Sequence, residues 1–266
     1  MKIKYSIVSR GSERYINHGY MGITEKSDNK QYLLDVDHGV QNIDKIKNYL
    51  CFEPKYTIQN IALSRFELIS EILFQRIKIS DNILICGLGG VGFSCLINLL
   101  KRGYKNISIY SRNYLSDLKE IEEYFDVKIK KEKFITGTHD TYIDATGDTA
   151  VLNDIMNNID FFKNIIILGT YHDTKFQINP ILINRKSLSI YGGHEFNGVS
   201  LEYRNKLYRN LLEENKLFDK IMVKYISINN YSEENLKQIL NKKKNYIDIF
   251  KYWIWINGGN IWWKIY

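Results

Sequence analysis

A glycine-rich loop between a short apolar run and a helical segment limits the fold of this chain more than any other feature. Residues 82–86 (NILIC) form an apolar run of strand length, and residues 87–92 (GLGGVG) match the pattern G-x-G-x-x-G. The pattern is informative where it connects a strand to a helix. Gly87 then permits the tight turn, Gly89 lets a pyrophosphate approach the backbone, and Gly92 lets the helix pack against the strand. The loop therefore predicts a dinucleotide-binding β-α-β unit, with a glycine turn that binds nothing as the alternative.

Strand-like and helical segments alternate after the loop. Strands are predicted at residues 107–110, 127–133, 142–144, 165–168 and 188–191. Helices are predicted between them at residues 115–125, 148–159 and 179–185, and the last two have Asp148 and Asn179 as capping residues. Strands that alternate with helices over roughly 110 residues predict a parallel sheet with helices on both faces.

The two ends of the chain have a different pattern. Short β-prone pieces stand at residues 5–8 and 31–36. Further helices are predicted at residues 57–78, 200–213 and 232–243, each with Thr or Ser at its N-cap. The aromatic run at residues 252–256 and the NGGN turn after it predict a terminal hairpin.

The net charge of +7, with a pI near 9.0, raises the question of a nucleic-acid partner. Residues 1–80 carry 12 of the 37 basic and 9 of the 30 acidic residues, so the excess is spread along the chain rather than gathered in one basic patch. The apolar runs are too short to span a bilayer, and the N-terminus lacks the apolar core of a signal peptide. Three cysteines form no disulfide framework in a chain of this length. We therefore expect a cytoplasmic protein that binds neither nucleic acid nor a membrane.

The residues after the second strand of the β-α-β unit bear on the choice of dinucleotide. An NAD site places Asp or Glu there to bond the ribose hydroxyls. This chain has Ser111, Arg112 and Asn113, and no acid before Asp117. A carboxylate would repel a 2′-phosphate, whereas a guanidinium attracts it and stacks on adenine. The sequence therefore predicts NADPH as the cofactor, with a merely solvated Arg112 as the alternative.

Several motifs together resemble one known family. The stretches ILICGLGGVG, YSRN, YIDATGD, IIILGTY and INPILINRKSLSIYGG resemble, in order and spacing, the nucleotide-binding domain of the medium-chain dehydrogenases/reductases. The stretch YSIVSRGSER resembles the loop that carries the family's active-site Cys-Gly-Thr/Ser-Asp motif. It is more similar still to I-S-R-G-T-E, a zinc-free variant in relatives of bacteriochlorophyllide dehydrogenases. The resemblance covers most of the chain, strongly in the middle and weakly before residue 57.

The resemblance implies an α/β fold with a doubly wound parallel Rossmann sheet and a small, reduced, mainly-β N-terminal catalytic lobe. The lobe and its connecting helix would take residues 1–80, and the dinucleotide-binding domain residues 81–250. A strand or hairpin at residues 251–266 would return to the lobe. The family commonly pairs its subunits through the strand that corresponds to residues 188–191, which implies a homodimer.

By the same resemblance, a nicotinamide cofactor would lie between the two lobes and contact three groups of residues. Those at its pyrophosphate would be Gly87, Gly89, Gly90, Val91 and Gly92. Those at its adenosine end would be Ser111, Arg112 and Asn113. Those along its length would be Ala145, Thr146, Gly147, Gly169, Thr170 and Tyr171. All three groups follow predicted strands, where ligands of parallel sheets bind.

The chain departs from the family at the metal site. Arg10 stands where the family has its catalytic zinc cysteine, no Gly-His-Glu motif follows it, and the three cysteines form no C-x-x-C pair. We therefore expect no zinc, so that a side chain must supply the proton for a reduction. The candidates are polar groups near predicted loops and strand ends: Ser12, Glu13, His38, Tyr171 and His194.

The sequence thus predicts a zinc-independent, NADPH-dependent oxidoreductase that reduces a C=O or an activated C=C or C=N of a small organic substrate, in a specialised biosynthetic pathway. A non-catalytic partner or scaffold that keeps the cofactor domain is one alternative, because the N-terminal lobe is short. A methyltransferase that binds S-adenosylmethionine is another, although such enzymes usually keep an acid after the second strand.

Overall fold

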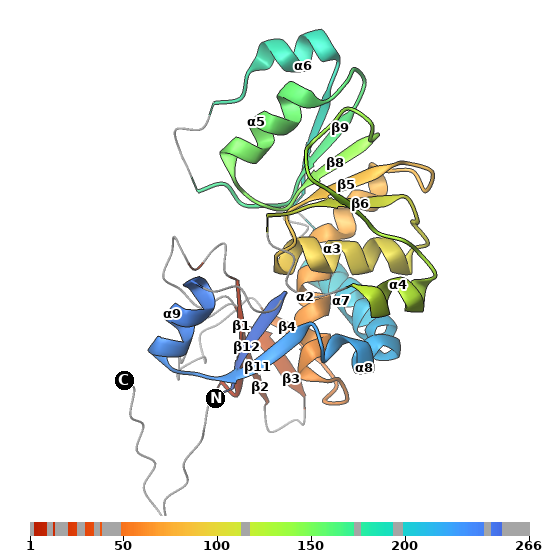
Figure 1. The fold of residues 1–266 in the computed structure, drawn as a ribbon. Helices are drawn as coiled ribbons and strands as arrows, with labels where there is room; N and C mark the ends of the chain where they lie inside the picture. Colours follow the sequence, from red (N-terminus) through yellow and green to blue (C-terminus); the bar gives the residue numbers. More distant parts are fainter. Residues whose placement is uncertain are drawn as a thin grey trace, which may run out of the picture. The chain divides into compact units, whose positions relative to one another are not determined.

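The computed structural model describes residues 3–9, 13, 21–25, 30–34, 38, 49–112, 118–172, 177–193, 199–241 and 246–251. The chain divides into two compact units (Figure 1). Unit 1 comprises Met1–Ala62 and Ser200–Tyr266, and unit 2 comprises Leu63–Val199. Within the residues described, each unit contains a six-stranded sheet.

Unit 2 has the predicted parallel sheet. Its strands are β5 (Ile83–Cys86), β6 (Ile107–Tyr110), β7 (Lys130–Glu132), β8 (Thr141–Asp144), β9 (Asn164–Ile167) and β10 (Ser189–Gly192). They lie in the order β10-β9-β8-β5-β6-β7, and every neighbouring pair is parallel. This is the strand order of the doubly wound dinucleotide-binding fold, so the predicted Rossmann sheet is confirmed.

The described helices of unit 2 are α3 (Gly90–Lys101), α4 (Lys119–Phe125), α5 (Thr149–Asn158) and α6 (Pro180–Lys186). α5 and α6 begin where the sequence predicts them, whereas α4 begins at Lys119, inside the predicted range 115–125, and residues 113–117 lie outside the described residues. Asp148 and Asn179 cap α5 and α6, since each side chain accepts a hydrogen bond of 3.0 Å from a backbone N–H of the first turn. Leu84 and Cys86 of β5 face a core cluster that includes α5, while Ile83 and Ile85 point to the opposite face of the sheet.

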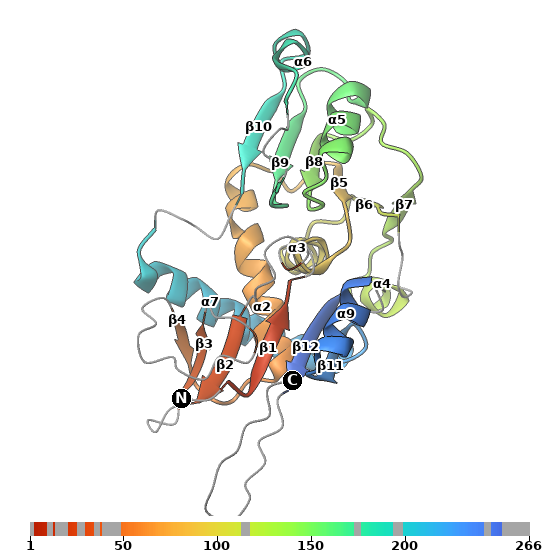
Figure 2. The same ribbon diagram turned by 90° about the vertical axis from the view of Figure 1, so that its left-hand side faces the viewer.

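Unit 1 has a mainly antiparallel sheet. Its strands are β1 (Tyr5–Val8), β2 (Met21–Glu25), β3 (Gln31–Leu34), β4 (Tyr49–Phe52), β11 (Ile226–Asn230) and β12 (Ile247–Lys251). The order is β11-β12-β1-β2-β3-β4, and only β11 and β12 are parallel among the described pairs (Figure 2). The helical elements after residue 200 are α7 (Leu201–Asn215), the short 3₁₀ turn η2 (Lys216–Phe218), α8 (Asp219–Met222) and α9 (Glu233–Asn241). The predicted mainly-β lobe is therefore present.

The segments after residue 200 belong with the N-terminal strands rather than with the parallel sheet. Residues 248–251 of β12 pair with β1, and the ring of Tyr208 on α7 lies 5.6 Å from that of Phe52 on β4. The boundaries between the compact units therefore lie at residues 62/63 and 199/200. The sequence predicts them instead at residues 80/81 and 250/251. The predicted strand at residues 252–256 and the hairpin after it lie outside the described residues.

The helix predicted at residues 57–78 is α2 (Ile58–Ser70) followed by the 3₁₀ turn η1 (Glu71–Gln75). Thr57 caps it as predicted, since its Oγ1 accepts a hydrogen bond of 3.1 Å from the N–H of Asn60. The boundary between the two units falls inside α2. None of the helices in the described part of the chain has the length and apolar character needed to cross a membrane.

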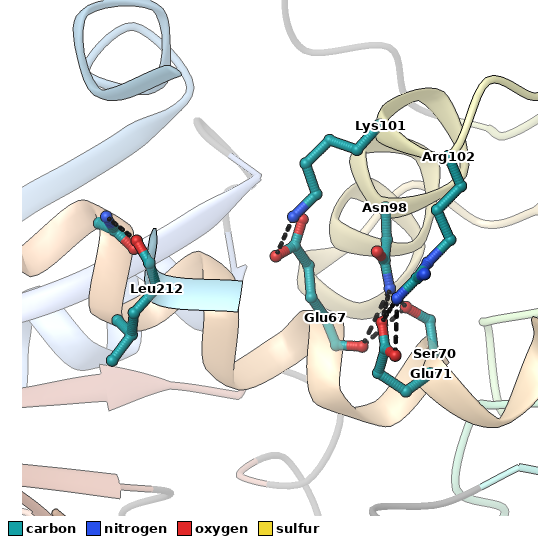
Figure 3. Close-up of polar contacts among 8 residues, drawn as sticks. Glu67, Ser70, Glu71, Asn98, Lys101, Arg102 and Leu212 are labelled. Atoms are coloured by element: carbon teal, nitrogen blue, oxygen red, sulfur yellow. Dashed lines mark hydrogen bonds and ion pairs between the residues drawn. The ribbon is translucent and has the colours of Figure 1, made fainter. Parts of the chain in front are cut away.

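Buried polar contacts join α2 and η1 to α3 within unit 2 (Figure 3). Lys101 Nζ lies 3.0 Å from Glu67 Oε2, and both side chains are almost completely buried. The side-chain amide of Asn98 donates to Ser70 Oγ at 3.0 Å and to Glu71 Oε1 at 2.8 Å, and Arg102 pairs with the same Glu71 carboxylate. These contacts hold the carboxyl end of α3, the helix that begins in the glycine loop.

Candidate functional site

Three of the four glycines in the loop differ in what the fold requires of them. One makes the turn, one allows close packing, and one has open space beside it. Gly87 has a φ of +91°, which residues with a side chain rarely adopt. A Cβ on Gly92 would lie 2.0 Å from the carbonyl oxygen of Gly87, so only glycine fits there. Gly89 is extended, with a φ of −87°, and a Cβ on it would meet nothing within 4 Å. The fold therefore requires Gly87 and Gly92, whereas the space beside Gly89 at the start of α3 is unfilled by the described protein atoms.

The segments that follow β8 and β9 are in close backbone contact. A Cβ on Gly147, whose φ is +64°, would lie 2.3 Å from the carbonyl oxygen of Thr170. A Cβ on Gly169 would lie 2.3 Å from the backbone nitrogen of Gly147. Both glycines thus hold the carboxyl ends of neighbouring strands together, beside the glycine loop that leaves β5.

Hydrogen bonds connect these strand ends in what we call the carboxyl-edge network, defined as Arg112, Asp148, Thr146, Asp144 and Tyr171. An Nη of Arg112 donates to Asp148 Oδ2 at 3.2 Å. The N–H of Asp148 donates to Thr146 Oγ1 at 3.0 Å, and that hydroxyl donates to Asp144 Oδ1 at 2.6 Å. The hydroxyl of Tyr171 donates to the other oxygen of Asp144. The network therefore runs from the end of β6, past β8, to the segment after β9.

Asp144 is the buried member of this network. It ends β8 with no exposed surface, and burial is the main reason that its pKa rises from 3.8 to about 6. The two hydrogen bonds from Thr146 lower the pKa, and the charge of Asp148 raises it. Cys86, which lies opposite Asp144 in the pairing of β5 with β8, also has a raised pKa, chiefly because it is buried. Asp144 is consequently a carboxyl group that changes its protonation state close to neutral pH.

Asp148 is an acid that the sequence analysis missed at the adenosine end of the predicted site. The residues that directly follow the second strand contain no acid before Asp117. In the structure, Asp148 approaches Arg112 from the segment after β8, because β6 and β8 flank β5 in the sheet. In the order of a doubly wound sheet the first strand lies between the second and the fourth, so this order contains the signal that the segments after β6 and β8 come close together.

A second polar cluster lies within unit 1, where two predicted catalytic candidates meet. His38 Nε2 lies 2.8 Å from Glu13 Oε2, and His38 Nδ1 lies 2.7 Å from Ser6 Oγ. The N–H of Ser9 donates to the other Glu13 oxygen at 2.8 Å. The side chains of His38 and Glu13 are only 6% and 3% exposed, and the ring of Phe250 lies edge-on to the imidazole. The cluster therefore holds the imidazole between a carboxylate and a hydroxyl.

Ser6 is a member of this cluster that the sequence analysis did not select. It is a fully buried polar residue in β1, between Tyr5 and the buried Ile7. A serine within a strand that is otherwise apolar was the available signal, because a buried hydroxyl needs a hydrogen-bond partner.

The remaining predicted residues have separate places. Tyr171 bonds Asp144 within unit 2, whereas Glu13 and His38 belong to unit 1. Gly90 and Val91 form the first turn of α3, Ala145 follows β8, and Thr170 follows Gly169. Ser111 and Arg112 directly follow β6. Ser12, Asn113 and His194 lie outside the described residues.

The described residues contain no group of three or more His, Cys, Asp and Glu side chains that could hold a metal ion. Cys86 and Cys95 are buried in unit 2, and Cys51 is partly exposed in unit 1. The expectation of a zinc-free protein remains a prediction.

The fold is similar to that of several solved structures. The Bacillus subtilis protein YhfP with NAD bound aligns with a TM-score of 0.68 at 12% identity, over 94% of this chain and 89% of that chain. The Salmonella enterica YhdH oxidoreductase in complex with NADP aligns with a TM-score of 0.67 at 12% identity, over 94% of this chain and 89% of that chain. The 2R,3R-butanediol dehydrogenase from Bacillus subtilis has a TM-score of 0.64 at 13% identity, over 94% of this chain and 91% of that chain. At these identities the likeness establishes the fold. The sequence itself matches no protein-family model and no curated protein.

Proposed function

We propose that this protein is a zinc-independent oxidoreductase of the medium-chain dehydrogenase/reductase type, which uses NADPH to reduce a C=O or an activated C=C or C=N of a small organic substrate. The glycine loop is the observation that carries the proposal. Its first and last glycines are required by the fold, but the protein's own packing places no such demand on Gly89. A glycine with open space at a helix N-terminus suits a backbone that a pyrophosphate approaches.

The residues at the carboxyl edge fit a nicotinamide dinucleotide. The backbone of Gly87, Gly89 and Gly92 would hold the pyrophosphate, and Ser111 and Arg112 would hold the adenosine end. The segments after β8 and β9 would lie along the rest of the cofactor. Such a cofactor supplies a hydride when it is bound. YhfP with NAD and YhdH with NADP have the same fold, which supports a cofactor of this class.

The chain itself would have to hold and deliver a proton. The imidazole of His38 is the best group for this among the described candidates, because histidine is a common general acid and this ring has partners on both nitrogens. Glu13 would orient the ring on one side, and Ser6 would bond its other side. Ser12, Tyr171 and His194 remain candidates for contact with the substrate.

Fluorescence titration with NADPH and with NADH tests the cofactor, and NADPH oxidation in the presence of aldehydes, enones and imines tests the reaction. We expect NADPH to bind more tightly than NADH, and at least one acceptor class to be reduced at a rate that a chelator does not change. Absence of binding of both nucleotides would refute the proposal. Binding without turnover of any acceptor would favour a cofactor-binding scaffold instead.

We also infer a homodimer in which two copies pair along β10. This strand is an edge of the parallel sheet, with one side unpaired in the described chain. Light scattering after size exclusion should give a mass near twice 31.4 kDa. A mass near 31.4 kDa at every protein concentration would contradict the dimer.

A further inference from the structure

An ion pair crosses the carboxyl end of the strand from which the glycine loop leaves. In the parallel sheet, β5 lies between β6 and β8. Arg112 comes from the end of β6 and Asp148 from the segment after β8, and their side chains meet at 3.2 Å. Ligands of doubly wound sheets bind outside these carboxyl ends. The pair therefore lies where the adenosine half of a dinucleotide would be held.

We propose that Asp148 determines cofactor specificity by competing with the 2′-phosphate of NADPH for Arg112, so that the preference for NADPH over NADH is smaller than Arg112 alone would give. This inference rests on the proposed function, because it assumes that a nicotinamide dinucleotide binds at this edge.

The carboxylate of Asp148 is fixed beside Arg112. Its Oδ1 accepts a hydrogen bond from the N–H of Ala150 at 3.0 Å as the cap of α5, and its own N–H is bonded to Thr146. A side chain held at both its backbone and its carboxylate does not easily swing away when a ligand arrives. The negative charge would therefore stay close to any phosphate that Arg112 binds.

The two nucleotides differ in how they meet this charge. NADPH brings a 2′-phosphate, which must share or take over Arg112 and which the carboxylate repels. NADH brings a 2′-hydroxyl, which can donate a hydrogen bond to a carboxylate. The side chains of Arg112 and Asp148 are 78% and 35% exposed, so the pair itself is weak and a phosphate can displace it. Asp148 thus favours NADH, and Arg112 favours NADPH.

The test is the ratio of the NADH to the NADPH dissociation constant, measured by fluorescence titration of the full chain. Asp148→Asn removes the charge and keeps a good helix cap, and Asp148→Ser provides a second capping variant. We expect both to raise the ratio by about fivefold, the size expected of an exposed charge pair. Asp154→Asn is the matched control, since it removes one charge from the same helix, and it should leave the ratio unchanged. Arg112→Gln should lower the ratio and reduce the effect of Asp148→Asn, because the competition for Arg112 is then gone while the direct repulsion between the carboxylate and the phosphate remains.

Three results would overturn the inference. If both nucleotides bind and the ratio stays unchanged in both Asp148 variants, the inference fails while the proposed function stands. If Asp154→Asn changes the ratio as much as Asp148→Asn does, the effect is one of general charge and the assignment of Asp148 fails. If neither the wild-type chain nor any variant binds either nucleotide, the proposed function fails, and the inference fails with it.

Discussion

The hydroxyl of Tyr171 donates a hydrogen bond to the buried carboxyl group of Asp144, and so ties the segment after β9 to the end of β8. Thr146 bonds the other oxygen of that carboxyl group through both its N–H and its hydroxyl. One buried acid therefore shapes two of the segments that would lie along a cofactor. A change in its protonation state should consequently change the free energy of unfolding.

We expect Asp144→Asn to change the pH dependence of stability. The carboxyl group has a pKa of about 6 in the folded chain against 3.8 as the ordinary value, so the folded state binds more protons between these pH values. Stability from Asp144 is thus fully present below about pH 4, falls as the pH rises to about 6, and is constant above that. Denaturant unfolding of both chains from pH 4 to 8 should show the wild type losing on the order of 3 kcal/mol relative to the variant. A difference that is the same at every pH would contradict the raised pKa.

Two glycines of the loop, Gly89 and Gly92, should respond differently to alanine. Gly89→Ala meets open space in an extended backbone but replaces the N-cap of α3, so its unfolding free energy should stay within about 1 kcal/mol of the wild type. Its affinity for NADPH should fall by at least about tenfold, because the methyl group would occupy the approach of the pyrophosphate. Gly92→Ala should instead lose about 1–3 kcal/mol of stability, since its Cβ would lie 2.0 Å from the Gly87 carbonyl. Undiminished NADPH binding by a folded Gly89→Ala protein would contradict this assignment.

The cluster in unit 1 should affect turnover without affecting cofactor affinity. We expect His38→Ala to lower kcat by about 100-fold or more, and Glu13→Gln and Ser6→Ala to lower it less, because they act through the imidazole. The dissociation constant of NADPH should stay within about twofold, as the glycine loop belongs to the other unit. Ser227→Ala is the control, because Ser227 bonds Asp248 in the same sheet at 2.6 Å without contacting His38 in any described hydrogen bond. Equal turnover of His38→Ala and the wild type would remove His38 from the reaction.

Removing one partner of the buried ion pair of Glu67 and Lys101 should lower the free energy of unfolding far more than removing one partner of an exposed pair (Figure 3). Lys101→Met leaves the Glu67 carboxylate buried without its cation, which should cost about 3–5 kcal/mol in urea unfolding. The double variant with Glu67→Gln should recover part of that loss. Lys119→Met is the matched control, since Lys119 pairs with Glu123 at 3.6 Å with both side chains more than half exposed, and it should cost less than about 0.5 kcal/mol. Similar losses in Lys101→Met and Lys119→Met would show that the buried pair contributes little.

Local features of the fold could be predicted from the sequence because they depend on residues close together in the chain. The caps at Thr57, Asp148 and Asn179 each act on the first turn of their own helix. The glycine loop likewise needs only its own backbone and the strand before it. Among the parallel strands of unit 2, β5, β6 and β9 are short runs rich in Ile, which the sequence shows directly, whereas β7 has the polar sequence KKE.

Strands defined by their partners were harder to predict. β11 has the sequence ISINN, with alternating burial and little apolar content, and β12 ends at Lys251, before the aromatic run at residues 252–256 for which the sequence predicts a strand. β12 pairs with β1, more than 200 residues earlier in the chain, and β11 pairs with β12. Their strand structure follows from this pairing. Sequence periodicity contains no signal for such distant pairing.

The sequence by itself determined the succession of a strand, a glycine loop and a helix, because each of these depends on residues close together in the chain, and this succession predicts a phosphate-binding turn. It also supplied Glu13, His38, Arg112 and Tyr171 as separate candidates. The tertiary structure decided what surrounds them. Glu13 and Ser6 bond the two sides of His38, Asp144 accepts a hydrogen bond from Tyr171, and Asp148 pairs with Arg112. The physical reason is that charges and hydrogen bonds act over a few ångströms of space, and sheet pairing, not chain distance, brings these groups within that range.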